Sequence, residues 1–238
     1  MELETFTLWK WKKKGIPLAE RVKKRNQAKV YGLRCVNRDS FDDLRKNDTV
    51  LVTGDAFCLS EDVKRFESFN IPHDLYCVNR SMLFFERPVL HWAAVDAEES
   101  AWFAANINDK VFPHGHRIWR HTLGIIPIAY DWFWEVSNNL EGEYARHLWM
   151  GNTGYFAILT SIFMGYKKIV IAGMPLDNSR HFYDPEGTEG PQWIGRAYTQ
   201  WMDFKLKVFE SERVRSMSGY TAFILGQANK EWISGNTE

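Results

Sequence analysis

The sequence has little of what marks a membrane-spanning, secreted or disulfide-stabilised protein. None of its apolar runs approaches the roughly 18 residues that a membrane-spanning helix needs. Its first residues, MELETFTLWKWKKKG, do not form a secretory signal. The three cysteines, Cys35, Cys58 and Cys77, are widely spaced and odd in number, so neither a disulfide framework nor a zinc site is indicated. These absences lead us to expect a soluble, cytoplasmic protein.

The sequence also lacks a net charge, because 30 Lys and Arg residues balance 30 Asp and Glu residues. Its 45% of hydrophobic and 25% of charged residues are typical of a folded protein and exclude a disordered one. The balance hides an asymmetry. Residues 1–34 contain ten basic and three acidic residues, a charge of +7, so residues 35–238 carry −7.

The basic segment, residues 1–34, has two interpretations. It could hold phosphates, a nucleic acid or an anionic membrane surface, with Trp9 and Trp11 as aromatic anchors. Alternatively, it contains a solvated helix around residues 18–29 whose basic face meets water or packs on the acidic body, which is the commoner fate of a charge run. We therefore divide the chain into a basic N-terminal extension, residues 1–46, and one domain, residues 47–238.

Strand-like and helix-like segments alternate along residues 47–238. Buried strands are predicted at residues 49–53, 74–78, 89–95, 168–172 and 214–217, where the sequence is largely apolar. Helices are predicted at residues 61–68 with Ser60 as N-cap, 97–106, 152–163 with Gly165 as the stop, 194–208 and 220–227. Residues 108–150 show no clean period beyond a candidate strand at 124–130. This alternation predicts an α/β fold, a Rossmann-like, mostly parallel sheet with helices on both faces.

In such a fold, ligands bind beyond the carboxyl ends of the strands. Gly54 and Asp55 follow the first predicted strand, where a glycine lets the backbone approach a ligand. Asp55 would repel a phosphate and better suits a ribose hydroxyl or a metal ion. The segment contains neither a Gly-x-Gly-x-x-Gly nor a Walker pattern, and a plain tight turn is the alternative.

Two further junctions carry polar residues. Asn79 follows the second strand and can recognise a base or sugar, while Arg80 beside it can pair with a phosphate. A helix cap and a surface arginine are the alternative. Asn152, Thr153 and Gly154 open the helix before strand 168–172, where free backbone amides favour a nucleotide phosphate. Simple capping of that helix would equally explain them.

The loop of residues 177–192 follows strand 168–172 and concentrates reactive side chains. Asp177, Arg180, His181, Tyr183 and Asp184 lie within eight positions of it. His181 could act as a general base or acid near neutral pH, although a histidine in a surface loop often has no such role. A pair at His114 and His116 could chelate a metal ion, but typical partner ligands are missing, so we predict no metal site.

Across these junctions the sequence resembles the Rossmann-like bacterial sialyltransferases that use CMP-sialic acid (glycosyltransferase family 42) and related motility-accessory and pterin-pyrophosphokinase domains. The family's Gly-Asn-Gly-Pro-Ser-Leu, Cys-Asn-Gln and Thr-Ser-Gly motifs correspond to residues 54–59, 78–80 and 152–154. Its Leu-Gly-Tyr-Lys and Ser-Gly-Ile-Asp motifs correspond to residues 164–167 and 172–175. The resemblance spans roughly residues 48–226 and is strongest over 152–175. It implies a nucleotide pocket formed by Gly54, Asn79, Thr153 and Gly154.

Two departures from the family bear on catalysis. The asparagine that contacts the nucleotide in the family is Asp55 here. The family's general-base histidine, in an Ile-Gly-His stretch, corresponds to Arg196, and an arginine cannot act as a base at neutral pH. His181 would have to replace it.

The sequence therefore leads to a nucleotide-dependent transferase, glycosyl or pyrophosphoryl, as the first hypothesis. Asn79 and residues 152–154 would hold a nucleotide or nucleotide sugar as substrate, Arg80 or Arg196 would neutralise phosphate, and His181 or Asp55 would manage protons or a metal ion. A need for Mg²⁺ and the nature of any cofactor are left open. The alternative is a non-catalytic binding module whose basic N-terminal segment docks a nucleic acid or a protein partner.

Overall fold

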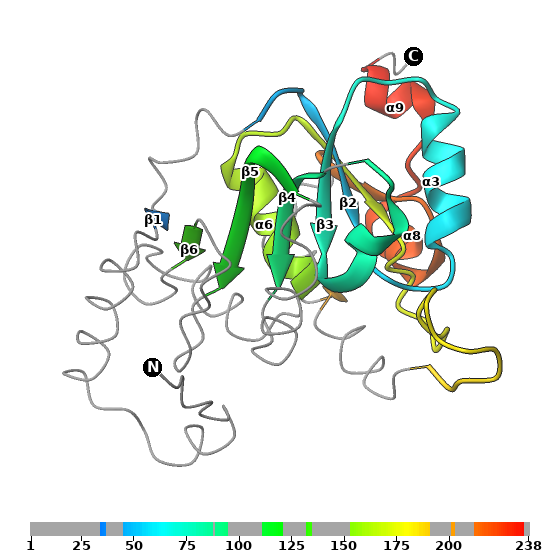
Figure 1. The fold of residues 1–238 in the computed structure, drawn as a ribbon. Helices are drawn as coiled ribbons and strands as arrows, with labels where there is room; N and C mark the ends of the chain where they lie inside the picture. Colours follow the sequence, from blue (N-terminus) through cyan, green and yellow to red (C-terminus); the bar gives the residue numbers. More distant parts are fainter. Residues whose placement is uncertain are drawn as a thin grey trace, which may run out of the picture.

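The computed structural model of the chain describes residues 34–36, 45–87, 89–94, 111–120, 132–134, 153–190, 201–202 and 212–235. In these residues, strands form one sheet in the order β1-β6-β5-β4-β3-β2-β7-β8, and each neighbouring pair runs parallel (Figure 1). The predicted α/β fold with a mostly parallel sheet is confirmed.

The described strands and helices have the following bounds. The strands are β1 (Arg34–Val36), β2 (Thr49–Thr53), β3 (Asp74–Val78), β4 (Val89–Ala94), β5 (Val111–Arg120), β6 (Trp132–Trp134), β7 (Lys168–Ala172) and β8 (Val214–Ser216). The helices are α3 (Leu59–Glu67), the 3₁₀ helix η2 (Asn79–Phe84), α6 (Thr153–Phe163), α8 (Gly219–Leu225) and α9 (Lys230–Ser234).

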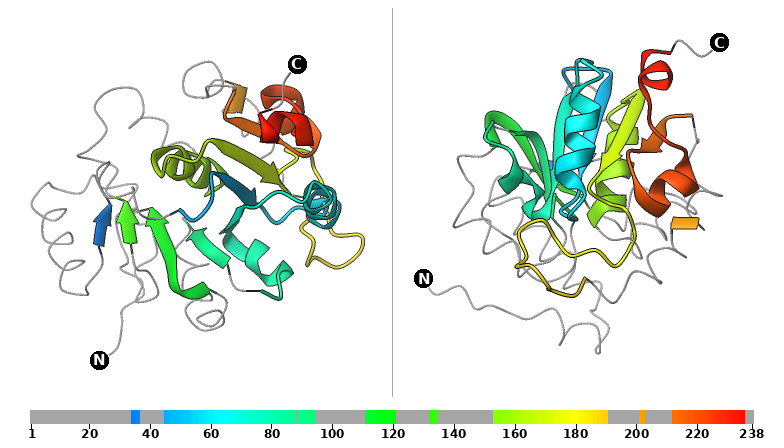
Figure 2. Two further views of the ribbon diagram at one scale, coloured as in Figure 1. Left: turned by 90° about the horizontal axis from the view of Figure 1, so that it is seen from above. Right: turned by 90° about the vertical axis from the view of Figure 1, so that its right-hand side faces the viewer.

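The strand β2 lies inside the sheet between β3 and β7, and all five of its residues are buried. Successive side chains of a strand point to opposite faces, so Val50 and Val52 pack with α6 and α8, whereas Leu51 packs with α3 and α9. Two hydrophobic clusters, one on each face, result from this alternation. The left panel of Figure 2 shows α6 and α3 on opposite sides of the sheet. The prediction of helices on both faces is confirmed.

Most predicted elements in the described ranges are present, with shifted ends. The strands predicted at 49–53, 74–78 and 168–172 have those bounds, and Gly165 ends α6 with a left-handed φ of 77°. Ser60 is not an N-cap, because α3 already begins at Leu59 after Cys58, which makes no side-chain capping bond. The helix α9 was not expected. The elements predicted at 97–106 and 124–130, and most of 194–208, lie outside the described residues.

The carboxyl ends of the parallel strands lie at one edge of the sheet, hereafter the carboxyl edge. In Figure 1 the strand arrows point down toward this edge, and η2 and the yellow loop after β7 lie there. Most of the residues predicted to form a site follow these strand ends. Part of the predicted extension, β1, pairs with β6 and belongs to the same sheet. The boundary at residue 46 stays a prediction, and residues 1–33 lie outside the described part of the chain.

Candidate functional site

At the carboxyl edge, the backbones that leave β2 and β7 touch each other through two glycines. The Gly54 N–H donates to the Ala172 carbonyl at 2.8 Å. A Cβ on Gly54 would lie 2.4 Å from Met174 Cγ and 2.6 Å from the Gly173 carbonyl oxygen, closer than real contacts allow. Gly173 itself has a φ of 65°. The predicted Gly54 is therefore required by close packing within the protein, which supports the tight-turn interpretation, and its contact with a nucleotide stays a prediction.

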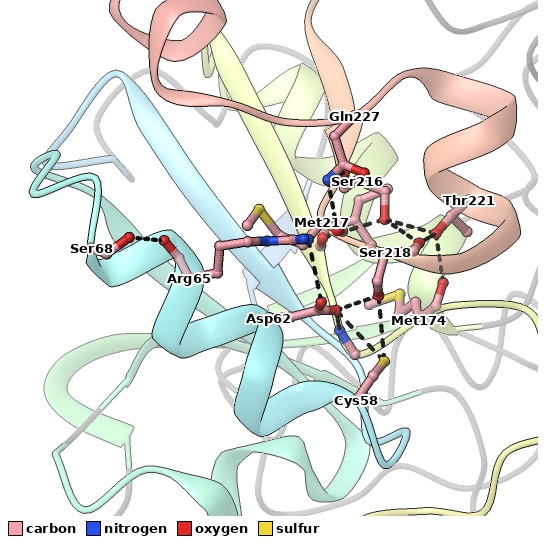
Figure 3. A network of polar contacts seen from close by, with 12 residues as sticks. Cys58, Asp62, Arg65, Ser68, Met174, Ser216, Met217, Ser218, Thr221 and Gln227 are labelled. Carbon is pink, nitrogen blue, oxygen red and sulfur yellow. Dashed lines mark hydrogen bonds and ion pairs between the residues drawn. The ribbon is translucent and has the colours of Figure 1, made fainter.

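A buried carboxylate fixes the same corner of the molecule (Figure 3). Asp62 of α3 is 2% exposed, and its Oδ2 accepts hydrogen bonds from the Ser218 hydroxyl at 2.6 Å and from the Gly173 N–H at 2.9 Å. The Cys58 thiol also points to Oδ2, at 3.6 Å. Burial raises the pKa of Asp62 despite these donors. The contacts tie α3 to the chain that follows β7 and β8, so this part of the carboxyl edge is held rigidly.

The loop after β7 is attached to the turn after β2 by backbone pairing. Ala56 and His181 form an antiparallel bridge. On its two sides, the Phe57 N–H donates to the Arg180 carbonyl and the Phe182 N–H to the Asp55 carbonyl, both at 2.9 Å. Two segments 125 positions apart in the sequence, at Ala56 and His181, are thereby brought together. His181 consequently lies beside the end of β2 rather than at the tip of a free loop.

The imidazole of His181 is held by a carboxylate three positions later. Asp184 Oδ2 lies 2.8 Å from His181 Nδ1 and also accepts the His181 backbone N–H at 2.9 Å. Desolvation acts to raise the pKa of Asp184, but the two hydrogen bonds from His181 and the charge of Arg180 outweigh it and lower the pKa. The side chain of His181 is 34% exposed. An accessible histidine oriented by a carboxylate through Nδ1 is the arrangement of a general base.

Tyr183 connects three of the predicted site residues. Its ring stacks on that of His181, with centroids 5.1 Å apart and planes at 7°. Its hydroxyl donates to Asp55 Oδ2 at 3.3 Å, and the guanidinium of Arg80 lies 5.2 Å from its centroid. Asp55, Arg80 and His181, which the sequence places after different strands, thus converge on one aromatic ring.

Asn79 begins η2 directly after β3 in a left-handed backbone conformation, with φ of 51°. Its carbonyl accepts the indole N–H of Trp92 at 2.9 Å, which fixes the backbone. Within the described part of the chain, its side-chain Oδ1 is buried and accepts no hydrogen bond. A buried acceptor without a donor costs about 1–3 kcal/mol. A ligand that brings an N–H or O–H group would remove this cost.

The remaining predicted residues are only partly described. Thr153 and Gly154 begin α6 and are both buried, Thr153 with 4% exposure. Their contact with a nucleotide stays a prediction. Asn152 and Arg196 lie outside the described residues.

The described residues contain no cluster of three histidine, cysteine or acidic side chains suited to hold a metal ion. Burial raises the pKa of both the Cys58 and the Cys77 thiol to about 12, so neither is a nucleophile at neutral pH. Among the described helices, none is long and apolar enough to cross a membrane.

Sequence reasoning did not select Tyr183, Asp184 or Asp62 as site residues. Tyr183 and Asp184 stood among the polar residues of the loop without assigned partners. A histidine followed three positions later by an aspartate is a local signal that could have suggested the pair. Asp62 has no such signal, because its partners Gly173 and Ser218 are more than 100 positions away.

Comparison with known proteins supports the fold. No protein-family model matches the chain, and no curated protein matches it in sequence. A mammalian sialyltransferase solved in complex with Gal-beta-1-3GalNAc-ortho-nitrophenol is similar in structure, with a TM-score of 0.50 and 11% identity over 89% of this chain and 83% of that chain. Another mammalian sialyltransferase structure has a TM-score of 0.48 and 12% identity, over 89% of this chain and 85% of that chain. The chain therefore shares its α/β fold with the first of these two structures.

Proposed function

We propose that the chain is a glycosyltransferase that moves a sugar from a nucleotide sugar to a hydroxyl group of an acceptor, at the carboxyl edge of the sheet. The observation that carries the proposal is the pair of His181 and Asp184, 2.8 Å apart beside the end of β2. A glycosyltransferase-like fold accounts for the place of the site, and the Asp–His pair supplies the base that such a reaction needs.

In this reaction, His181 accepts the proton of the acceptor hydroxyl. Asp184 engages Nδ1, so Nε2 is the nitrogen that takes the proton. The acceptor oxygen forms a bond to the anomeric carbon of the donor sugar while the bond from that carbon to the nucleotide phosphate oxygen breaks. The electron pair of the broken bond stays on the phosphate, which leaves with the nucleotide. Asp184 stabilises the imidazolium that is formed.

The nucleotide would bind at the end of β3. The buried Oδ1 of Asn79 fits an amino group of a base or a hydroxyl of a ribose, each of which supplies a donor. Arg80, the next residue, would compensate the charge of the leaving phosphate. Its guanidinium lies over the Tyr183 ring, so it is held on the same side of the edge as His181. The buried start of α6, at Thr153 and Gly154, would complete the pocket.

A thermal-shift panel of CMP, UDP and their sugar derivatives, each with and without Mg²⁺, tests the nucleotide site. We expect a CMP- or UDP-type ligand to stabilise the wild type. Asn79→Gly keeps the left-handed backbone accessible but removes the amide, so its affinity should fall about tenfold, the effect of one well-placed hydrogen bond. Asn70→Gly is the matched control, because Asn70 also has a left-handed φ, of 54°, and is exposed.

Transfer to a Gal-β-1,3-GalNAc glycoside, the kind of molecule found in complex with the structural neighbour, tests the role of the histidine. His181→Gln should lower kcat about 100-fold or more without changing nucleotide affinity, since a general base contributes that much. If no nucleotide or nucleotide sugar stabilises the wild type, the proposal is wrong. Salt-sensitive binding of a polynucleotide that is lost on deletion of residues 1–34 would then favour the non-catalytic binding module.

A further inference from the structure

We infer that Tyr183 is a positioning residue of this site, which fixes the plane of the His181 ring and joins it to Asp55. The inference rests on the proposed function for the chemistry that His181 performs. The contacts of Tyr183 with His181 and Asp55 do not depend on that chemistry. The orientation of the His181 ring can therefore be measured in the protein without substrate.

A single hydrogen bond does not fix an imidazole. Asp184 holds His181 at Nδ1, but the imidazole is 34% exposed and, without a further contact, can rotate out of this hydrogen bond, which would exchange its tautomers and turn Nε2 away from an acceptor. The Tyr183 ring restricts this freedom, because it stacks on the imidazole with nearly parallel planes, 7° apart, at a centroid distance of 5.1 Å. Misplacement of a reacting group by about 1 Å can cost a factor of 100 in rate, so such support has a direct catalytic consequence.

The hydroxyl of Tyr183 anchors the ring to the turn after β2. It donates to Asp55 Oδ2 at 3.3 Å. Burial raises the pKa of the Tyr183 phenol, and the negative charge of Asp55 raises it further. The phenol therefore stays protonated at neutral pH, so it acts as a fixed hydrogen-bond donor and not as an acid or base of the reaction.

The same ring also carries Arg80, whose guanidinium lies 5.2 Å from its centroid. Three contacts of Tyr183 thus involve chemically different polar groups: an imidazole, a carboxylate and a guanidinium. Its ring also packs edge-on against Phe182, with centroids 5.1 Å apart. Phe182 itself packs edge-on against Phe84 and joins the hydrophobic cluster of α3, so among these side chains it contacts aromatic rings, whereas Tyr183 also contacts polar groups of the site. This contrast supplies a matched control within the same loop.

The first test follows the His181 ring by ¹⁵N NMR, with its signals assigned from their loss in His181→Gln. In the wild type above the titration range, we expect one fixed tautomer with the proton on Nδ1, because Nδ1 faces Asp184. Tyr183→Phe keeps the stacking ring and should retain this tautomer. Tyr183→Leu removes the ring and should give averaged tautomers. Phe182→Leu should resemble the wild type.

The second test measures turnover with the donor found by the nucleotide panel. Tyr183→Leu should lower kcat about tenfold or more through misplacement of the base, while the acceptor KM stays close to that of the wild type. Tyr183→Phe, which keeps the ring, should have a kcat close to that of the wild type. This difference between the two variants would not arise if the loss of kcat in Tyr183→Leu came from a general folding defect. If Tyr183→Leu does not fold, Tyr183→Met takes its place, because it fills more of the buried volume without a ring.

The outcomes separate the inference from the proposed function. Averaged tautomers in Tyr183→Leu without turnover of any donor by the wild type would support the positioning role and contradict the glycosyltransferase proposal. A fixed Nδ1 tautomer in Tyr183→Leu, or turnover in that variant equal to turnover in Phe182→Leu, would overturn the positioning role. Absence of a fixed tautomer in the wild type would overturn it as well.

Discussion

Replacement of Asp62 by alanine should destabilise the protein measurably, because this one carboxylate joins three segments. Asp62→Ala removes the acceptor of the Gly173 N–H, a buried backbone group, and of the Ser218 hydroxyl. A buried donor left unsatisfied costs about 1–3 kcal/mol. The Ser218 hydroxyl is half-buried and precedes α8, so it can turn to another acceptor and adds little.

One effect acts in the opposite direction, because the substitution abolishes the desolvation cost that raises the pKa of Asp62. The higher helix propensity of alanine is offset, because Asp62 lies in the first turn of α3, where a carboxylate interacts favourably with the helix dipole. The net loss should therefore be about 2 kcal/mol in the free energy of unfolding. The control is Glu61→Ala, on the same helix and of the same charge but exposed, for which we expect about 0.5 kcal/mol or less.

Urea denaturation followed by far-UV circular dichroism compares the two variants with the wild type. The reasoning predicts a lower midpoint for Asp62→Ala with an unchanged slope, since the surface exposed on unfolding is the same. Equal midpoints for the two variants would refute it, and would mean that Asp62 does not carry the contacts seen in Figure 3.

Three further predictions concern other parts of the molecule. Gly54→Ala should cost about 1–3 kcal/mol, because its Cβ would lie 2.6 Å from the Gly173 carbonyl oxygen; a thermal melt equal to that of the wild type would contradict this. The pKa values of the Cys58 and Cys77 thiols are raised to about 12, so these thiols should react with a thiol reagent near pH 8 only after unfolding. The reaction is measured in a variant that lacks the third cysteine, Cys35. Rapid labelling of the native protein would contradict the raised pKa values. The pKa of Asp184 is lower in the folded protein than in the unfolded chain. Its ionised carboxylate therefore stabilises the fold at pH values above the pKa of the unfolded state, and this stabilisation is lost as the pH falls through the pKa of the folded state. Asp184→Asn should therefore show a smaller fall in Tm than the wild type between about pH 5 and pH 3, and an equal fall would argue against the pair with His181.

The central strands could be predicted from the sequence because burial on both faces leaves an uninterrupted apolar run. The residues of β2, β3 and β7 have the predicted bounds for this reason. Local patterns were less informative at helix ends. Ser60 was a plausible cap by residue type, but α3 starts one position before it. The five-residue α9 is too short to show a period, although Asn229, which accepts the Trp232 N–H, was a readable cap.

Long-range polar contacts could not be predicted, because nothing in a local pattern states which side chains meet. His91 shows this clearly. It is fully buried in β4, and its Nε2 lies 2.7 Å from the hydroxyl of Tyr166, which donates to Asp74 at 2.7 Å. No spacing rule connects these three residues. The same holds for the meeting of Asp55, Arg80 and His181 at Tyr183. Sequence reasoning could propose those three side chains, but their convergence depends on sheet order.

That sheet order also determines where a ligand-binding crevice is expected. Along the chain, the strands from β2 to β6 succeed one another in one direction across the sheet, and the chain then returns to place β7 on the other side of β2. The direction of winding therefore reverses between β2 and β7. In open α/β sheets, such a reversal is where a ligand-binding crevice is expected, without any side chain having to create it. Here the backbone contact of Gly54 with Gly173 lies at that position. In the proposed transferase, a change of substrate would therefore require new residues in the loops after β3 and β7, while the sheet stays the same.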